Sequence, residues 1–226
     1  AFMGQALVQI TLPHSDPGVP FFERTNGAVS LSIIANPRIG LPFGTVPRLL
    51  LAWICTEAVK TKSPMLGLGK SQNEFLRKLG MRTDGRDCQR LRAQSLKLFS
   101  SMLSITYQSH GRFGLKNMPI ADEAFVLWDP HRPDDRMLWE STLKLSSEFF
   151  RNVTESPVPI DMRVLHALSK SPLAMDVYSW LVYRIFLLRV TNRPSVLIPW
   201  KSLKLQFGAD YSDTPRGLIK KKKRFL

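Results

Sequence analysis

Cysteine is scarce in this sequence: Cys55 and Cys88 are the only two in 226 residues. Two separated thiols exclude a disulfide framework and favour a reducing compartment, so we expect a cytoplasmic protein. Long hydrophobic runs are also missing, because the longest apolar stretch, residues 178–188, is interrupted by Arg184 and is too short to span a bilayer. No signal peptide opens the sequence, and no contact with a membrane is predicted.

Acidic residues are few, 18 against 32 Lys and Arg, which gives a net charge of +14 and a pI near 10.2. Such an excess points to a polyanionic partner, above all a nucleic acid, although a basic surface that is merely solvated is the simpler alternative. Apolar residues make up 44% of the chain, enough for a core. The length favours two small domains over one large domain.

Patterns that carry catalysis are missing as well. The four histidines are isolated, and no pair has the spacing of metal ligands; they are His14, His110, His131 and His166. His131 with Asp134 and Asp135 could hold a cation, but a polar loop is favoured there. Residues 66–71 (LGLGKS) lack the spacing of a phosphate-binding loop. We therefore expect no catalytic residue, no metal site and no cofactor, and we do not predict an enzyme.

Two loosely alternating segments, 6–12 and 28–34, predict strands at the start of the chain. Thr45, with Pro47 in the first turn, predicts the beginning of a helix over residues 45–60. One apolar stripe marks its buried face: Val46, Leu49, Leu50, Trp53 and Ile54. Residues 65–68 follow as a short strand.

A helix-turn-helix is predicted next. Ser71 and Glu74 have the spacing of a capping box, in which each side chain bonds the other's backbone N–H, and Gly80 ends the helix that they open. Thr83 or Asp84 caps a second helix that runs to about residue 102. Its apolar stripe is Cys88, Leu91, Ser95, Leu98, Phe99 and Met102.

Residues 105–120 predict a β-hairpin with a glycine turn, and residues 125–128 a further strand. The polar, proline-rich segment 129–135 is the predicted boundary between two modules. Beyond it, the predicted elements are a strand over 143–150, helices over 161–168 and 171–191, a strand over 196–198, a helix over 200–207 ended by Gly208, and a basic helix from Thr214.

One order thus occurs twice: long helix, short strand, short helix, glycine turn and basic helix. It is typical of the winged helix, a helix-turn-helix followed by a β wing. We predict an α+β fold of tandem winged-helix modules, residues 1–130 and 131–226, in which the hairpin over 105–120 is the first wing. The second module is predicted to be truncated before its wing.

The second helix of a helix-turn-helix enters the major groove, where Arg, Lys, Gln and Asn read base edges. A solvated face is the alternative for each cation. The predicted contacts are the polar residues of the two basic helices, the hairpin and the short helix at 200–207: Arg82, Arg86, Gln89, Arg90, Arg92, Gln94, Lys97, Arg112, Lys116, Lys201, Arg216, Lys220, Lys221, Lys222, Lys223 and Arg224.

Five segments resemble the plasmid-encoded RepA-type replication initiators. They are 41–48 (LPFGTVPR), 66–71 (LGLGKS), 75–80 (FLRKLG), 145–150 (LSSEFF) and 172–178 (PLAMDVY). The resemblance implies binding to repeated sites in double-stranded plasmid origin DNA, opening of the duplex, and recruitment of the host factors DnaA and the replicative helicase. It also implies monomers in initiation and homodimers in repression of the initiator's own gene. A winged-helix repressor without an initiation role and a replication nuclease are the alternatives.

Overall fold

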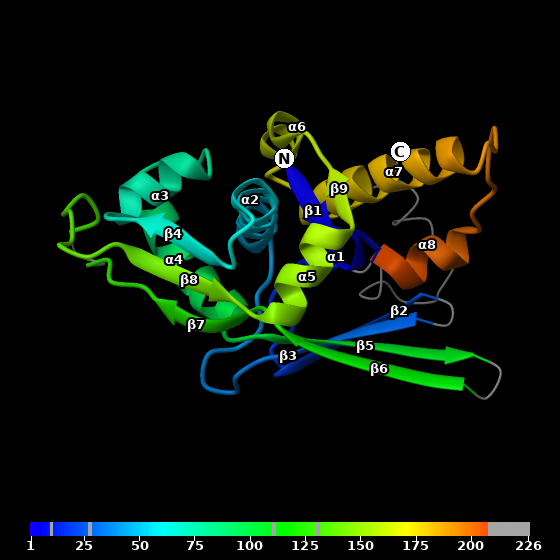
Figure 1. Cartoon of the computed structure of the whole chain (residues 1–226), viewed down its shortest axis with the longest axis horizontal. Coiled ribbons are helices and arrows are strands. Elements are labelled where there is room, and N and C mark those ends of the chain that lie inside the picture. The colour runs from blue at the N-terminus through cyan, green and yellow to red at the C-terminus, as the bar shows by residue number, and fades with distance from the viewer. Residues whose placement is uncertain (10, 27–28, 110–111, 130–131, 208–226) are drawn as a thin grey trace.

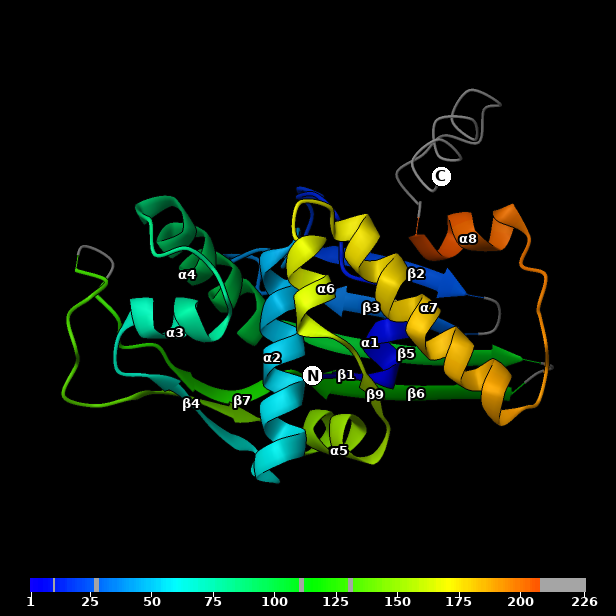
Figure 2. The same cartoon turned by 90° about the horizontal axis from the view of Figure 1, so that it is seen from above.

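The computed structural model describes residues 1–9, 11–26, 29–109, 112–129 and 132–207. It has a mixed α+β fold, as predicted, built around the central helix α2 (Val46–Thr61). Helices α3 and α4 with a three-stranded sheet form one end of the molecule, and α7 and α8 form the other end (Figure 1). Seen from above, α2 crosses between these two ends (Figure 2).

The other helices in the described residues are α1 (Gln5–Gln9), α3 (Gln72–Lys78), α4 (Gly85–Phe99), α5 (Ser147–Glu155), α6 (Met162–Ala167), α7 (Pro172–Val190) and α8 (Trp200–Phe207). The strands are β1 (Phe2–Gly4), β2 (Phe21–Asn26), β3 (Val29–Ile34), β4 (Met65–Gly69), β5 (Met102–Ser109), β6 (Arg112–Pro119), β7 (Ala121–Phe125), β8 (Ser141–Leu145) and β9 (Pro157–Pro159). All strand pairs are antiparallel, in the orders β1-β9, β2-β3-β5-β6 and β4-β8-β7.

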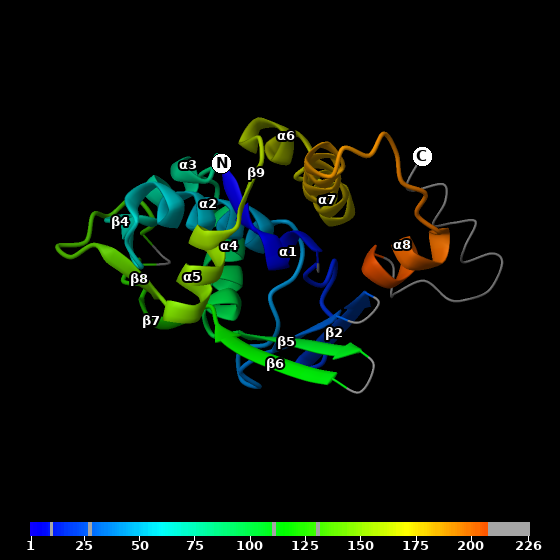
Figure 3. The ribbon, with the colours of Figure 1, turned by 45° about the vertical axis from the view of Figure 1, so that its right-hand side comes forward.

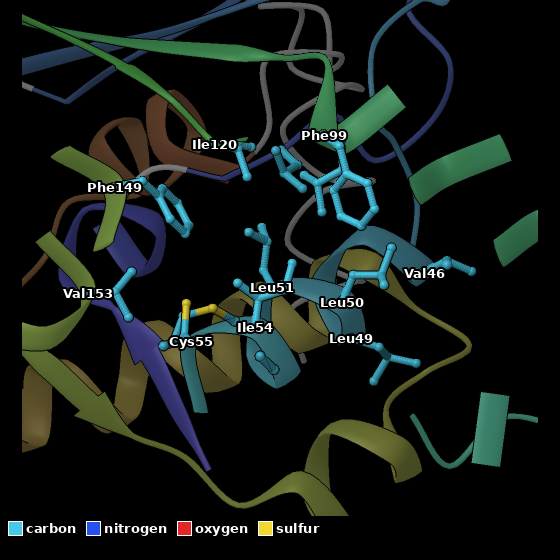
Figure 4. Close-up of a cluster of buried hydrophobic side chains, with 14 of the residues drawn as sticks. Val46, Leu49, Leu50, Leu51, Ile54, Cys55, Phe99, Ile120, Phe149 and Val153 are labelled. Carbon is cyan, nitrogen blue, oxygen red and sulfur yellow. The ribbon is translucent and has the colours of Figure 1, made fainter. Parts of the chain in front are cut away.

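Helix α2 is buried on most of its surface, rather than along the single predicted stripe. Leu51, Ala52 and Cys55 are buried in addition to most of the stripe, whereas Trp53 is only half-buried and packs edge-to-face on Phe75 with ring centroids 4.8 Å apart. Side chains from α4, α5 and the strand ends surround the helix (Figure 4). A helix enclosed in this way is apolar on nearly all sides, so periodicity understates its burial.

Two predicted strands near the chain's start and middle are wrong. Residues 5–9 form α1, which packs on α7, and only residues 2–4 pair as a strand, with β9. The predicted strand over 143–150 ends at Leu145 because the Ser146 hydroxyl accepts the N–H of Phe149 and begins α5. A serine at that position offers the backbone a helix start in place of a strand partner.

The hairpin predicted as the first wing, β5–β6, pairs with β3 and not with β4. The hairpin that joins β4 is β7–β8, because β8 pairs with both β4 and β7. The module boundary predicted after residue 130 falls in the segment between β7 and β8. A cut there would separate β8 from both of its hydrogen-bonded partners, β4 and β7.

The second copy of the predicted order forms only in part. Helices α6, α7 and α8 lie close to their predicted positions, with Ser171 capping α7 and Pro172 in its first turn. The strand predicted over 196–198 does not form, and Leu197 is almost fully exposed. Figure 3 shows α8 beside the end of β2, which it contacts. The glycine turn and the basic helix predicted from residue 208 onward lie outside the described residues.

A buried ion pair connects the N-terminal half to α7. The Arg48 guanidinium on α2 donates to both carboxylate oxygens of Asp176 on α7, each at 2.7 Å, and His14 Nε2 lies 2.9 Å from the same carboxylate. Arg48 also donates to the carbonyl oxygens of Leu12 and Gly44. Burial alone would raise the pKa of Asp176, but the charge of Arg48 and the hydrogen bonds from His14 and Arg48 outweigh it, so this pKa lies below its ordinary value.

Candidate nucleic-acid interface

Helix α3, the following turn and α4 are set by local sequence signals. The Ser71 hydroxyl accepts the N–H of Glu74 at 3.2 Å, as predicted. The return bond differs: the Glu74 carboxylate accepts the N–H of Lys70 rather than that of Ser71. The Asp84 carboxylate accepts the N–H of Asp87 and begins α4. Between the helices, Gly80 has a φ of +65°, and the N–H groups of Gly80 and Met81 bond back to α3. These are the two bonds of a Schellman ending.

Gly80 also lies against a part of the chain that is distant in sequence. A Cβ atom at this position would approach the His166 ring on α6 to 2.6 Å. We therefore expect Gly80→Ala to lower the free energy of unfolding by about 1–3 kcal/mol, from the left-handed backbone and the displaced ring. Gly85→Ala is the matched control, since nothing lies within 4 Å of its added Cβ. Urea denaturation of both variants measures the difference, and equal midpoints would contradict it.

Helix α4 has two distinct faces. Cys88, Leu91 and Leu98 are buried against α2 and α3, as the predicted stripe requires, although the helix ends at Phe99 and Met102 belongs to β5. The opposite face exposes Arg86, Gln89, Arg90 and Ala93 to solvent. The half of α4 next to the turn therefore presents two guanidinium groups and an amide side by side.

The Asp87 carboxylate forms ion pairs with two of the arginines at the start of α4, Arg82 and Arg90. Asp87 is buried, and it lies 3.0 Å from Arg90 and 3.8 Å from Arg82. Arg82 itself is 80% exposed and also lies 3.5 Å from Asp84. Arg86 forms no ion pair with any described residue. Arg86 is therefore the cation on this face that is most available to an anionic ligand, while Asp87 orients its two neighbours.

Three of the predicted contacts on α4 have structural partners instead. Gln94 is only 8% exposed, and its Oε1 accepts the N–H of Phe43. Arg92 donates to the Trp128 carbonyl oxygen at 3.0 Å. Lys97 lies 4.5 Å from the centre of the Phe43 ring and 3.5 Å from Asp16. These side chains hold neighbouring segments against α4, so each of them has a structural role in the fold.

The remaining predicted contacts are scattered. Arg112 is exposed on β6, whereas Lys116 pairs with Glu148 of α5 at 2.9 Å. Lys201 lies in α8, at the other end of the molecule from α4 (Figures 1 and 2), and its side chain is not described. The predicted contacts near the end of the chain lie outside the described residues; they are Arg216, Lys220, Lys221, Lys222, Lys223 and Arg224.

Sequence reasoning missed the cations at α3. Lys70 is exposed just before α3, and Arg77 and Lys78 are exposed in its last turn, where Arg77 lies 3.9 Å from Asp134 and Lys78 lies 3.4 Å from Glu74. The segment between β7 and β8 is bound to the start of this helix, since Asn73 donates to Asp134 at 2.6 Å and the N–H of Met137 donates to the Lys70 carbonyl oxygen. The two basic residues that follow two apolar residues in 75–78 (FLRK) are the signal that could have found these cations. No local signal indicated where the segment between β7 and β8 docks.

A groove runs between α4 and the segment that leads into α2. It has a volume of about 310 Å³ and is lined by Phe43, Gly44, Thr45, Val46, Gln89, Arg90, Ala93 and Gln94. The Gln94 and Lys97 contacts with Phe43 build one wall. Arg48, fixed by Asp176, donates to the Gly44 carbonyl oxygen behind it. The groove therefore opens beside Arg90 on the exposed face of α4.

The two thiols are not reactive groups. Burial raises the pKa of Cys55 to about 12, and burial followed by the nearby charges of Asp84, Asp134 and Asp87 raises the pKa of Cys88. Within the described ranges, no three His, Cys, Asp or Glu side chains gather where they could hold a metal ion. None of the described helices has the length and apolar character needed to cross a membrane.

The chain is similar to solved structures and to one protein family. Two crystal structures of domains 2 and 3 of RctB have a similar fold at 12% sequence identity. The first aligns with a TM-score of 0.58 over 98% of this chain and 82% of the RctB chain. The second aligns with a TM-score of 0.56 over 96% of this chain and 79% of the RctB chain. No curated protein sequence matches. Residues 41–202 match the family described as plasmid encoded RepA protein, which covers most of the chain, including α2, α3 and α4. The chain belongs to this family of RepA-type replication initiators.

Proposed function

We propose that this protein initiates plasmid replication by binding repeated origin sites through a winged helix made of α2, β4, α3, α4 and the hairpin β7–β8. The observation that carries the proposal is the exposed face of α4, where Arg86, Gln89 and Arg90 stand opposite the buried stripe. Arginine and glutamine are the side chains that pair with guanine and adenine edges in the major groove. The cations of α3 would then contact the phosphate backbone.

In this proposal α4 is the reading helix, and the wing differs from the one predicted. Strand β8 lies between β4 and β7, so the β7–β8 hairpin extends the sheet that directly precedes the helix-turn-helix. The β5–β6 hairpin belongs to the other sheet, and Arg112 on it is a more distant phosphate contact. A second winged helix from α7 onward remains part of the proposal.

Opening of the duplex follows from assembly rather than catalysis. Several copies bound side by side bend the DNA next to an easily melted segment, at a cost of about 1–6 kcal/mol that phosphate contacts offset. No catalytic residue, metal or cofactor is needed for this role. Recruitment of DnaA and the replicative helicase, and self-association as a dimer, are part of the proposal by family resemblance.

Footprinting on plasmid origin DNA tests this function. We expect protection of clustered repeats. If about six phosphates are contacted, the logarithm of the affinity plotted against the logarithm of the salt concentration should have a slope of about −5. Protection confined to a promoter would favour a repressor without an initiation role. A site-specific nick in supercoiled origin DNA, in the presence of Mg²⁺, would show a nuclease. A slope near zero would contradict binding through the basic faces.

A further inference from the structure

Strand β7 has a free edge. It is an outer strand of the β4-β8-β7 sheet (Figure 1), and among the described strands it pairs only with β8. Apart from that pairing, the backbone N–H and carbonyl groups of residues 121–125 bond to no described residue. An edge of this kind presents a row of donors and acceptors with which another extended chain can pair.

A second groove, the edge groove, follows this strand. It has a volume of about 350 Å³ and is lined by residues 121–124 and by Val126, Ile39, Leu96, Phe99 and Ser100. Glu123 and Ala124 are successive residues in regular register with β8, so their side chains point to opposite faces of the sheet. Because both of them line the edge groove, it runs along the edge of β7 rather than under one face.

Apolar side chains from two other elements complete the edge groove. Leu96, in the last turn of α4, is 41% exposed, and Ile39, in the segment before α2, is 37% exposed. When a peptide adds to a sheet edge, backbone hydrogen bonds supply affinity, and pockets for its alternate side chains supply specificity. The free edge and these two aliphatic side chains therefore form a site for an extended chain.

The charge of the edge groove indicates what kind of chain fits. None of the described residues that line it is Lys or Arg, although the protein has a net charge of +14. Asp122 is exposed and forms no ion pair with a described residue, whereas Glu123 pairs with Lys144 at 2.7 Å. Carboxylates at this edge repel DNA phosphates and attract cationic side chains.

The same carboxylates disfavour a second copy of this strand as the occupant. If two β7 edges paired antiparallel about Glu123, Asp122 and Glu123 of one copy would lie across from the same residues of the other copy. Like charges across a strand pair are destabilising, and charged edge strands resist pairing with themselves. The partner strand is therefore expected to carry the opposite charge.

We propose that the edge groove binds an extended segment of another protein in which cationic side chains alternate with apolar ones. The segment adds a strand to β7, with its apolar side chains against Leu96 and Ile39 and its cations beside Asp122. This partner site does not depend on which helix reads DNA. Leu96 lies ten positions from Arg86, or about 15 Å along α4, so we expect DNA and the segment to bind together.

A synthetic peptide of alternating valine and lysine (VKVKVKV), with a fluorescein label, tests the site on the full chain. We expect saturable binding by fluorescence anisotropy and slower hydrogen–deuterium exchange at the amides of residues 121–125. The matched peptide with glutamate in place of lysine should bind at least about tenfold more weakly. The net charge of +14 would by itself favour the glutamate peptide, so equal binding, or no protection of β7, would overturn the proposal.

Asp122→Lys should weaken binding of the lysine peptide at least about tenfold, with an unchanged unfolding midpoint. Glu155→Lys is the matched control, because it makes the same change in charge at an exposed residue at the end of α5, and it should bind within about threefold of wild type. Equal losses in the two variants would overturn the site.

Two further outcomes would assign the edge groove to another occupant and also overturn the proposal. Displacement of the bound peptide by an origin duplex would assign it to the DNA interface. Protection of residues 121–125 that rises with protein concentration in the absence of peptide would assign it to a second copy. Failure of the protein to bind origin DNA would overturn the proposed function alone, and peptide binding at β7 would still support this site.

Discussion

Reversing Arg86 and Arg90 together to Glu is expected to reduce affinity for origin DNA by at least about 100-fold. Each arginine contact to a base or phosphate contributes about 1–3 kcal/mol, and 1.4 kcal/mol is a factor of ten. Both side chains are exposed on α4, and Arg90 also pairs with the buried Asp87 at 3.0 Å. Fluorescence anisotropy with a duplex that carries the origin repeats measures the affinity.

Lys60 and Lys62, at the far end of α2, provide the matched control. They are exposed, and their reversal to Glu changes the net charge by the same amount. We expect that double variant to bind within about threefold of the wild-type protein, because a distant charge acts only through a screened field. Equal losses in the two variants would mean that α4 is not the reading helix. Arg86→Gln alone should also weaken binding, since Arg86 has no ion pair among the described residues to compensate.

The largest effect on stability is expected from Arg48→Met, which leaves the buried Asp176 carboxylate without its guanidinium partner and with only His14 beside it. Breaking one side of a buried pair costs about 3–5 kcal/mol, and here the carbonyl oxygens of Leu12 and Gly44 also lose their donor. Urea denaturation measures the loss. Arg163→Met removes the partner of Asp161 in an exposed pair and should leave the midpoint unchanged.

Acid should act on the same pair. The pKa of Asp176 in the folded protein lies below its ordinary value of 3.8, so its contribution to stability is complete above that value and is lost as the pH falls through the folded pKa. Other carboxylates titrate in this range, so Asp176→Asn is the reference. The wild-type protein should lose its advantage over Asp176→Asn below about pH 4. A difference between the two that stays constant with pH would contradict a charged Asp176.

Local signals were sufficient for the α3–α4 unit. Ser71, Gly80 and Asp84 begin and end these helices through bonds to residues no more than six positions away, so the sequence alone predicts them. The stripe on α4 likewise identifies the exposed Arg86 and Arg90, because only one face of a helix can be buried against α2. Where structure depends on neighbours in the chain, the predictions hold.

Predictions failed where the structure of a segment depends on contacts with residues that are distant in the sequence. The sequence does not show that the segment before α2 lies beside Gln94, whose amide oxygen accepts the N–H of Phe43. The sequence analysis does not predict the β7–β8 hairpin, because β8 pairs with β4 across more than seventy residues and with β7 across a long intervening segment. The sequence pattern indicates where a strand such as β8 begins, but its hydrogen-bonded partners depend on the arrangement of the whole sheet.

The sequence by itself determined the charge, the ends of α3 and α4, and the family of this protein, because composition, capping and short motifs are properties of neighbouring residues. Only the tertiary structure decided which cations of the described residues form ion pairs, which hairpin extends the sheet of β4, and that Thr45 lines a groove instead of capping a helix. These are questions of burial and partnership, and a side chain's partner is set by segments that reach it through the fold.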